Sequence, residues 1–295
     1  MKSLIFTGTA TALITPFKPN GEIDLEKYRE LIEFQISSGV DAIVAVGTTG
    51  ENAVLSGEEH RALMKCAVET ACGRVPVICS TGSNDTEYCI GTTTAAEEAG
   101  ADGLLLVTPY YNKCTQNGLI KHYERILSKT KLPAIVYNVP SRTGFNISIG
   151  TYKELSKHLQ IVGTKEASGN MALAMEIRAQ CGDDMPLYSG NDDLTVPMMA
   201  IGGKGVISVL SNILPKTTHE MTEYCLGKDF DKASELAFEY LDLTNALFSE
   251  VNPIPVKAAM NMMGMNVGGC RLPLCEMGAE NKEKLRQILI RHGLI

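Results

Sequence analysis

The sequence predicts a (β/α)8 barrel followed by a helical C-terminal segment. Short apolar runs rich in β-branched residues alternate with longer amphipathic segments, and the runs recur about every 20–35 residues, which fits one βα unit each. About eight units fit before residue 211. Near-continuous apolar runs are typical of strands buried on both faces, and eight such units close most naturally into a barrel. An open doubly wound sheet is the alternative, but the Gly-x-Gly-x-x-Gly fingerprint is missing after the first run.

The elements follow one another in strict alternation. The predicted strands are Thr9–Ile14, Ala42–Val46, Val75–Cys79, Leu104–Val107, Ala134–Tyr137, Ile161–Thr164, Leu187–Ser189 and Val206–Val209. The helical patterns between them are Asp24–Ser38, Gly57–Cys72, Asp85–Gly100, Gly118–Thr130, Ser148–Leu159 and Asn170–Cys181. Each run is short enough for a strand, and each amphipathic segment is long enough for a helix that covers the sheet.

After about residue 212 no further strand is predicted. Four helical patterns follow, interrupted by prolines, at Lys216–Leu226, Asp231–Phe248, Pro255–Met263 and Gly278–His292. No low-complexity linker separates this part from the barrel, so we expect it to pack firmly. The predicted division is a barrel that carries the active site in residues 1–224 and a helical domain in residues 225–295.

The composition disfavours several classes of function. The chain has 295 residues, 44% of them hydrophobic and 21% charged, and a net charge of −7 without a basic block, which argues against binding to nucleic acid or to an anionic membrane. No apolar run approaches the roughly 20 residues that span a bilayer, and no signal peptide is recognisable. The 9 cysteines form no Cys-x-x-Cys pair and the 5 histidines lie far apart. We therefore expect a cytoplasmic protein, and a metal-dependent enzyme is the less favoured interpretation, although a metal site could still assemble from distant positions.

The active site of a (β/α)8 barrel lies at the C-terminal ends of its strands. Five of the predicted strands end in reactive or hydrogen-bonding groups. The segments are Gly47–Glu51, Thr108–Asn112, Tyr137–Gly144, Thr164–Gly169 and Ser189–Asp193.

Lys165 is the clearest candidate for catalysis. It follows an apolar run at the mouth of the predicted barrel, where burial disfavours the charged amine and leaves a nucleophile able to attack a carbonyl. The alternative is a strand-end lysine whose ammonium reaches water. Lys204 and Lys257 are rivals, but both stand beside Gly or Pro and are predicted to lie in surface turns.

The other strand ends supply complementary groups. Thr48 and Thr49, in a glycine-bounded turn, suit a carboxylate or a phosphate, although a plain turn has the same pattern. Tyr111 and Tyr137 could relay protons or simply pack. Arg142 suits a bidentate grip on a carboxylate, or alternatively a surface ion pair. Together these groups are those required by an aldolase that forms a Schiff base with a 2-oxo acid.

The chain resembles the dihydrodipicolinate synthase family, within the neuraminate-lyase-like group of class I aldolases. The resemblance covers essentially the whole chain. It rests on five motifs in order, Gly47–Glu51, Pro109–Asn112, Tyr137–Gly144, Lys165–Gly169 and Gly205–Ser208, and on segments near both ends, Gly8–Ala10, Asn252–Lys257 and Arg271–Leu274.

The resemblance implies a condensation of pyruvate with aspartate β-semialdehyde to 4-hydroxy-tetrahydrodipicolinate, in lysine and diaminopimelate biosynthesis. It assigns the imine to Lys165, a proton relay to Tyr137, Thr48 and Tyr111, and the pyruvate carboxylate to Thr48 and Thr49, with Arg142 on the second substrate and Gly190 and Ile207 lining the pocket. Tyr111 would come from a neighbouring subunit. The implied assembly is a homotetramer of tight dimers, without a cofactor.

A regulatory site is implied as well. His60, Asn84 and Tyr110 match the lysine-binding pattern of feedback-inhibited family members, whereas Gly57 and Tyr88 replace a histidine and a glutamate of that pattern. Loss of a carboxylate that would pair with the effector's ammonium predicts weak or absent inhibition. For His60, a solvated helix face is the alternative.

Two other functions stay open. One is a pyruvate-dependent lyase of the same fold, such as an N-acetylneuraminate or 2-keto-3-deoxy sugar acid lyase. Arg142 favours the synthase, because the lyases typically carry an apolar residue there. The other is a binding protein that has lost turnover, against which the intact set around Lys165 argues.

Overall fold

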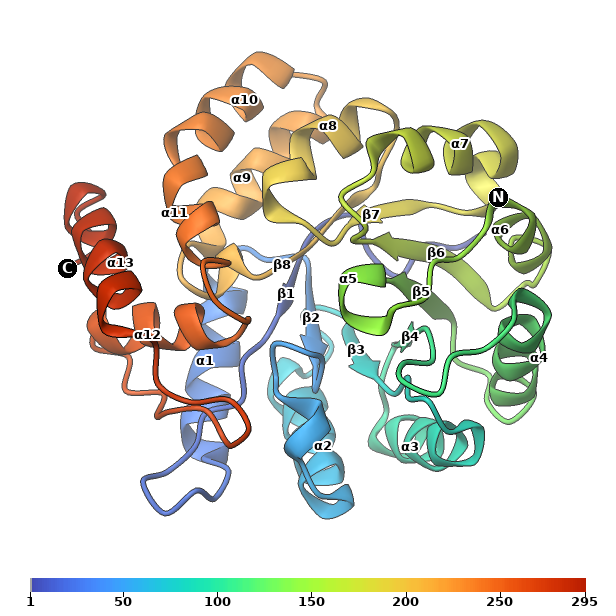
Figure 1. Cartoon of the computed structure of the whole chain (residues 1–295), viewed down its shortest axis with the longest axis horizontal. Coiled ribbons are helices and arrows are strands. Elements are labelled where there is room, and N and C mark those ends of the chain that lie inside the picture. The colour runs from blue at the N-terminus through green and yellow to red at the C-terminus, as the bar shows by residue number, and fades with distance from the viewer. Residues whose placement is uncertain (1) are drawn as a thin grey trace.

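The computed structural model, which describes residues 2–295, contains a closed barrel of eight parallel strands. Each strand pairs with the next, and β8 pairs with β1, so the predicted fold class is confirmed. The strands are β1 (Gly8–Ala12), β2 (Ala42–Ala45), β3 (Val77–Ser80), β4 (Gly103–Val107), β5 (Ala134–Asn138), β6 (Ile161–Glu166), β7 (Leu187–Ser189) and β8 (Gly205–Ser208). Helices surround them, as Figure 1 shows.

Most of the covering helices begin at a side chain that caps them. Asp24, Ser56, Asp85, Thr115, Ser148 and Asn170 each accept a hydrogen bond from a backbone N–H of the first turn, which satisfies a donor that has no partner within the helix. The capped helices are α1 (Leu25–Ser37), α2 (Gly57–Ala71), α3 (Thr86–Ala99), α4 (Gln116–Leu127), α6 (Ile149–Leu155) and α7 (Met171–Cys181).

Three helical elements differ from the prediction. The four-residue helix α5 (Pro140–Thr143) lies directly after β5, where the sequence predicted no helix, and α8 (Thr195–Ala200) completes the βα unit between β7 and β8, for which no helix bounds were predicted. The predicted helix Asp231–Phe248 is two helices, α10 (Phe230–Glu239) and α11 (Leu241–Ala246), which meet at Tyr240. These segments are short, so hydrophobic periodicity is a weak guide to their limits.

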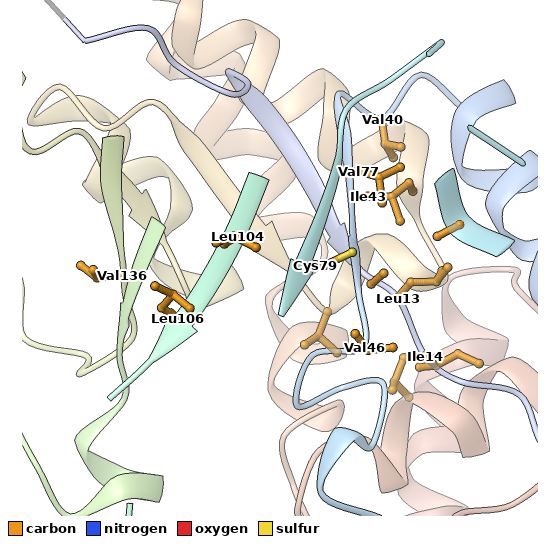
Figure 2. Close-up of a cluster of buried hydrophobic side chains, with 14 of the residues drawn as sticks. Leu13, Ile14, Val40, Ile43, Val46, Val77, Cys79, Leu104, Leu106 and Val136 are labelled. Carbon is orange, nitrogen blue, oxygen red and sulfur yellow. The ribbon is translucent and has the colours of Figure 1, made fainter. Parts of the chain in front are cut away.

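Alternate residues of each strand face two separate cores. Leu104 and Leu106 belong to the cluster between strands and helices, whereas Leu105 belongs to the cluster inside the barrel. Figure 2 shows part of the outer cluster, with side chains from neighbouring strands such as Ile43, Val77 and Val136. The inner cluster contains Tyr137, and this alternation also turns Lys165 toward the barrel interior, where it lines the central pocket.

The C-terminal helices share the barrel's cores. They are α9 (Pro215–Leu226), α10, α11, α12 (Ile254–Met262) and α13 (Ala279–Arg291), and α12 and α13 lie beside α1 and α11 in Figure 1. Buried residues of α12 and α13 belong to the same cluster as Leu13 and Tyr28. The division into domains after residue 224, in the last turn of α9, stays a prediction. Within residues 2–295 no helix has both the length and the apolar character needed to cross a bilayer.

Candidate active site

A pocket of about 160 Å³ lies at the C-terminal ends of the strands. Six of the predicted site residues line it, and they come from the ends of four strands, β2, β5, β6 and β7. These are Thr48, Thr49, Tyr137, Arg142, Lys165 and Gly190. Residues separated by more than 140 positions are thus brought to one place, as the fold requires.

Lys165 is at the centre of this pocket. Its side chain is buried, and it makes no ion pair or hydrogen bond with any of residues 2–295. Burial lowers the pKa of Lys165 to about 8, the carboxylate of Asp192 opposes this shift, and Arg142 adds to it. A substantial fraction of the amine is therefore neutral near physiological pH, and only a neutral amine can attack a carbonyl.

Gly190 makes room for the Lys165 side chain. A Cβ atom on Gly190 would lie 2.5 Å from the Cβ of Ala167 and 3.0 Å from the Cε of Lys165. A larger residue at position 190 would therefore clash with Ala167 and crowd the Lys165 side chain.

The turn after β2 presents Thr48 and Thr49. The Thr49 hydroxyl accepts a hydrogen bond from Asn252 Nδ2 at 2.9 Å, and Thr15 Oγ1 donates to the Gly50 carbonyl at 2.7 Å. A Cβ on Gly50 would lie 3.1 Å from the Leu13 carbonyl oxygen, so this turn packs closely on β1. Thr48 is half-buried and faces the pocket.

Tyr137 stands next to Lys165. The two residues are partners in the β5–β6 register, and the Lys165 Nζ lies 4.4 Å from the centre of the tyrosine ring. Burial raises the pKa of Tyr137 to about 12, so the phenol keeps its proton at neutral pH. It can then donate that proton to an oxygen on a neighbouring substrate atom.

Arg142 lies at the entrance, on α5. Its side chain is exposed, and Nη2 donates to the Asn252 carbonyl at 3.4 Å, which leaves the other donors of the guanidinium free toward the pocket. A residue that donates to an approaching carboxylate needs this exposure.

Two predicted residues do not line the pocket. Ile207 is fully buried on β8 and packs with Tyr137 inside the barrel. Tyr111 is 91% exposed and has a left-handed backbone with φ of 66°. Its predicted contribution to a neighbouring subunit stays a prediction.

The structure adds three polar residues that the sequence interpretation had not singled out. Asn191 and Asn252 line the pocket, and Asp192 is buried close enough to influence Lys165. One side-chain oxygen of each has no hydrogen-bond partner among residues 2–295. Buried acceptors without donors are costly, so a donor on a bound molecule would be favourable here. Asn252 sits directly before a proline, and the sequence alone carries no signal for this role.

The prediction for Lys257 is wrong. This lysine is buried on α12, where its ammonium pairs with Glu51 Oε1 at 2.6 Å and donates to the Gly269 carbonyl at 2.7 Å. The turn predicted from the neighbouring prolines ends at Pro253, and Pro255 is in the first turn of the helix, where a missing N–H costs nothing. Lys204 is half-buried and precedes β8.

The three predicted regulatory residues gather in a second pocket of about 310 Å³. His60, Asn84 and Tyr110 line it together with Tyr88. His60 is buried and its Nε2 donates to the Asn52 carbonyl at 3.0 Å, so it does not lie on a solvated helix face. Burial lowers the pKa of His60, which favours its neutral form.

A group of possible metal ligands lies far from these pockets. Within residues 2–295, Asp41, His219 and Glu223 have ligand atoms within 4.8 Å of one another. Asp41 precedes β2, so the group is at the opposite end of the barrel. Its Oδ2 already accepts a hydrogen bond from Thr9 N and contacts His219 Nδ1 at 3.0 Å.

These features define a class of protein. A (β/α)8 barrel whose central pocket holds a buried amine of low pKa, a neighbouring phenol and a threonine turn has the groups of a class I aldolase. The chain belongs to the dihydrodipicolinate synthetase family, whose model matches residues 5–292.

The relatives agree with this assignment. The 4-hydroxy-tetrahydrodipicolinate synthase of Acetivibrio thermocellus is 50% identical over 295 residues, which is all of both chains. A dihydrodipicolinate synthase from Acinetobacter baumannii, solved with pyruvate, is 42% identical with a TM-score of 0.96 and covers 98% of this chain and 99% of its own. A monomeric dihydrodipicolinate synthase variant is 41% identical with a TM-score of 0.96, covering 99% and 98%. The predicted family is therefore confirmed, and the synthase is favoured over a sugar-acid lyase.

Proposed function

We propose that the protein condenses pyruvate with L-aspartate 4-semialdehyde to 4-hydroxy-tetrahydrodipicolinate, a step of lysine and diaminopimelate biosynthesis, through an imine on Lys165. The observation that carries this proposal is the buried Lys165 amine, with no ion-pair partner among residues 2–295, in a pocket that also presents Thr48 and Thr49. Family membership and the names of the relatives support the choice of substrates.

The first step forms the imine. The neutral Lys165 amine attacks C2 of pyruvate, and the C2 oxygen leaves as water after it has received protons. The Thr48 and Thr49 hydroxyls hold the carboxylate, and Tyr137 supplies a proton to the departing oxygen. Because burial raises its pKa to about 12, the phenol still carries its proton at the start of the cycle.

The second step joins the substrates. The imine withdraws electrons from C3, which loses a proton and becomes an enamine that attacks the aldehyde carbon. The amine of the new chain then displaces Lys165 and closes the ring, which regenerates the free lysine.

The second substrate carries a carboxylate and an ammonium. Arg142 suits the carboxylate, and the unpartnered oxygens of Asn191 and Asn252 suit the ammonium, because both residues line the pocket and both oxygens lack donors among residues 2–295. A sugar-derived aldehyde has no such ammonium. This combination of one cation and two hydrogen-bond acceptors therefore supports the semialdehyde.

We further propose that Tyr111 of one subunit completes the relay of another, within a homotetramer of tight dimers. The exposure of Tyr111 and its absence from its own chain's pocket lining support this. We also propose a cytoplasmic location, supported by nine cysteines that are all free.

Lysine is proposed to inhibit weakly. The pocket of His60, Asn84 and Tyr110 offers Tyr88 where a carboxylate would be expected to pair with an ammonium. Half-inhibition by submillimolar lysine in a steady-state assay would contradict this proposal.

The decisive experiment measures pyruvate-dependent consumption of aspartate semialdehyde, coupled to a reductase that accepts the cyclic product. We expect turnover that falls by at least about 10³-fold in Lys165→Ala. Borohydride reduction in the presence of pyruvate should add mass at Lys165 only. Absence of both turnover and adduct in the folded protein would reject the proposed function.

The variant Arg142→Leu tests whether the protein is the synthase or a sugar-acid lyase. Loss of a charge-assisted contact should lower kcat/KM for the semialdehyde, and the corresponding loss of transition-state binding energy should be about 2–4 kcal/mol. The borohydride adduct with pyruvate should be retained. Unchanged turnover in this variant would remove Arg142 from the argument for the synthase.

A further inference from the structure

The turn that presents Thr48 and Thr49 is bounded on both sides by left-handed backbone. Val46 has a φ of 49° and Glu51 a φ of 57°, although neither is glycine. For a β-branched residue such as Val46 this conformation is especially unfavourable. Such a conformation persists only where its surroundings hold it in place.

The C-terminal segment supplies those surroundings at Glu51. Both carboxylate oxygens are used: Oε1 contacts Lys257 Nζ at 2.6 Å, and Oε2 accepts a hydrogen bond from Arg271 N at 2.9 Å. The Glu51 side chain is completely buried and that of Lys257 is 2% exposed. The ring of Phe17 contacts both cations, with its centre 4.2 Å from Lys257 Nζ and 4.4 Å from Arg271 Cζ.

The same segment reaches the turn at two more points. Asn252 donates to the Thr49 hydroxyl, and its carbonyl accepts from Arg142. The Arg271 side chain donates to the Val54 carbonyl at 3.0 Å and to Glu59 at 2.8 Å, which holds the chain that follows the turn. The segment from Asn252 to Arg271 is thus hydrogen-bonded to Thr49 and Glu51 in the turn and to the chain between the turn and α2.

A buried ion pair is a poor device for stability alone. Removing two charges from water costs about as much as their attraction returns, and an apolar pair of similar size often serves the fold equally well. The Glu51–Lys257 pair does not line the pocket. Its directional bonds, however, fix the position of the residue that closes the turn.

We propose that Lys257 and Glu51 are positioning residues for the substrate carboxylate: the buried pair holds Glu51 in the left-handed conformation that ends the Thr48–Thr49 turn and thereby sets the affinity for the 2-oxo acid. This inference rests on the proposed function, because it presumes that the turn binds the carboxylate of pyruvate. It assigns to the C-terminal helices a role in substrate binding that goes beyond completing the core.

The test uses the double variant Glu51→Gln with Lys257→Met in the full-length protein. Both charges disappear together, the new amide oxygen can still accept from Arg271 N, and the methionine fills the space of the lysine stem. We expect the KM for pyruvate to rise by about 10-fold or more while kcat at saturating pyruvate changes by less than about 3-fold. Lys284→Met, which removes an exposed ion pair with Glu280 on α13, is the matched control and should leave both constants unchanged.

A second measurement distinguishes positioning from general damage. Borohydride trapping at Lys165 is titrated with pyruvate and, separately, with acetone, a ketone that lacks the carboxylate. The half-saturating pyruvate concentration should rise with the KM, whereas trapping of acetone should be unchanged. Where the double variant fails to fold, Glu51→Gln alone, which keeps the side-chain shape, is titrated in the same way.

The outcomes separate the two proposals. Equal half-saturation with pyruvate in the wild type and in the folded variants would overturn the positioning role and leave the proposed function intact. An equal loss for pyruvate and acetone would also overturn it, because the damage would then concern Lys165 itself. No adduct of pyruvate in the wild type would instead reject the proposed function.

Discussion

The molecule contains two deeply buried lysines in opposite electrostatic settings. Lys165, inside the barrel, has no carboxylate in contact among residues 2–295, and burial lowers its pKa to about 8. Lys257, beneath the neighbouring turn, touches Glu51 at 2.6 Å; burial lowers its pKa, and the carboxylate opposes that shift. Burial alone therefore does not make a nucleophile. The distance to a counterion decides whether a buried lysine acts on a substrate or holds the protein together.

The largest contrast is expected when the same substitution is made at both sites. Lys257→Met leaves the Glu51 carboxylate buried without its partner, which should lower the free energy of unfolding by about 3–5 kcal/mol. Urea unfolding at pH 7 measures this loss. A change below about 1 kcal/mol would mean that water reaches Glu51 and replaces the lysine.

Lys165→Met should instead raise the free energy of unfolding. The folded-state pKa of about 8 lies below the ordinary value of 10.5, so folding at pH 7 works against protonation of this lysine and costs about 3 kcal/mol. The variant is expected to be more stable by up to this amount at pH 7. Because the unfolded chain binds more protons between pH 8 and 10.5, wild-type stability relative to the variant should rise through this window. A constant difference across these pH values would contradict the lowered pKa.

The pH dependence of adduct formation gives a smaller effect. Only the neutral amine attacks pyruvate, so the rate of borohydride trapping should increase about tenfold per pH unit below 8 and level off above it. Trapping at several pH values, with the reduction step kept fast, measures this profile. A rate that does not vary between pH 6 and 9 would show that the amine is neutral throughout.

The smallest expected effect concerns Asp192. Its carboxylate raises the pKa of Lys165 against the stronger influence of burial. Asp192→Asn keeps an oxygen that can accept from Val209 N and Leu210 N, and it should shift the trapping profile to lower pH. The exposed neighbour Asp193→Asn serves as the control. A shift to higher pH in Asp192→Asn would contradict the assigned direction.

The two lysines also differ in how well the sequence predicts their surroundings. The barrel was predictable because alternating apolar runs reflect strands buried on both sides, and Lys165 because it ends one of those runs. The same reasoning failed for Lys257. Its neighbouring prolines suggest a turn, whereas Pro255 lies in the first turn of α12, and its partner Glu51 is 206 positions away.

The unpredicted part of the site has a common physical origin. Asn252 and Asp192 act through contacts or charges that arise only when distant segments meet. Asn252 bonds to Thr49 across 203 positions, and Asp192 bonds to the residues after β8. Both residues lie in segments that the sequence analysis names, Ser189–Asp193 and Asn252–Lys257, but the local pattern does not show which side chain of the segment faces the site. Tertiary structure is needed to give them a role.

Tyr111 has a consequence for how the protein should be handled in solution. Its ring is 91% exposed and its backbone is left-handed, an arrangement that a lone chain gains little from maintaining. With Tyr111 donated to a second subunit as proposed, activity per molecule becomes a matter of mass action. Specific activity would then decline on dilution, recover on concentration, and depend on how long the enzyme has stood in the cuvette before substrate is added.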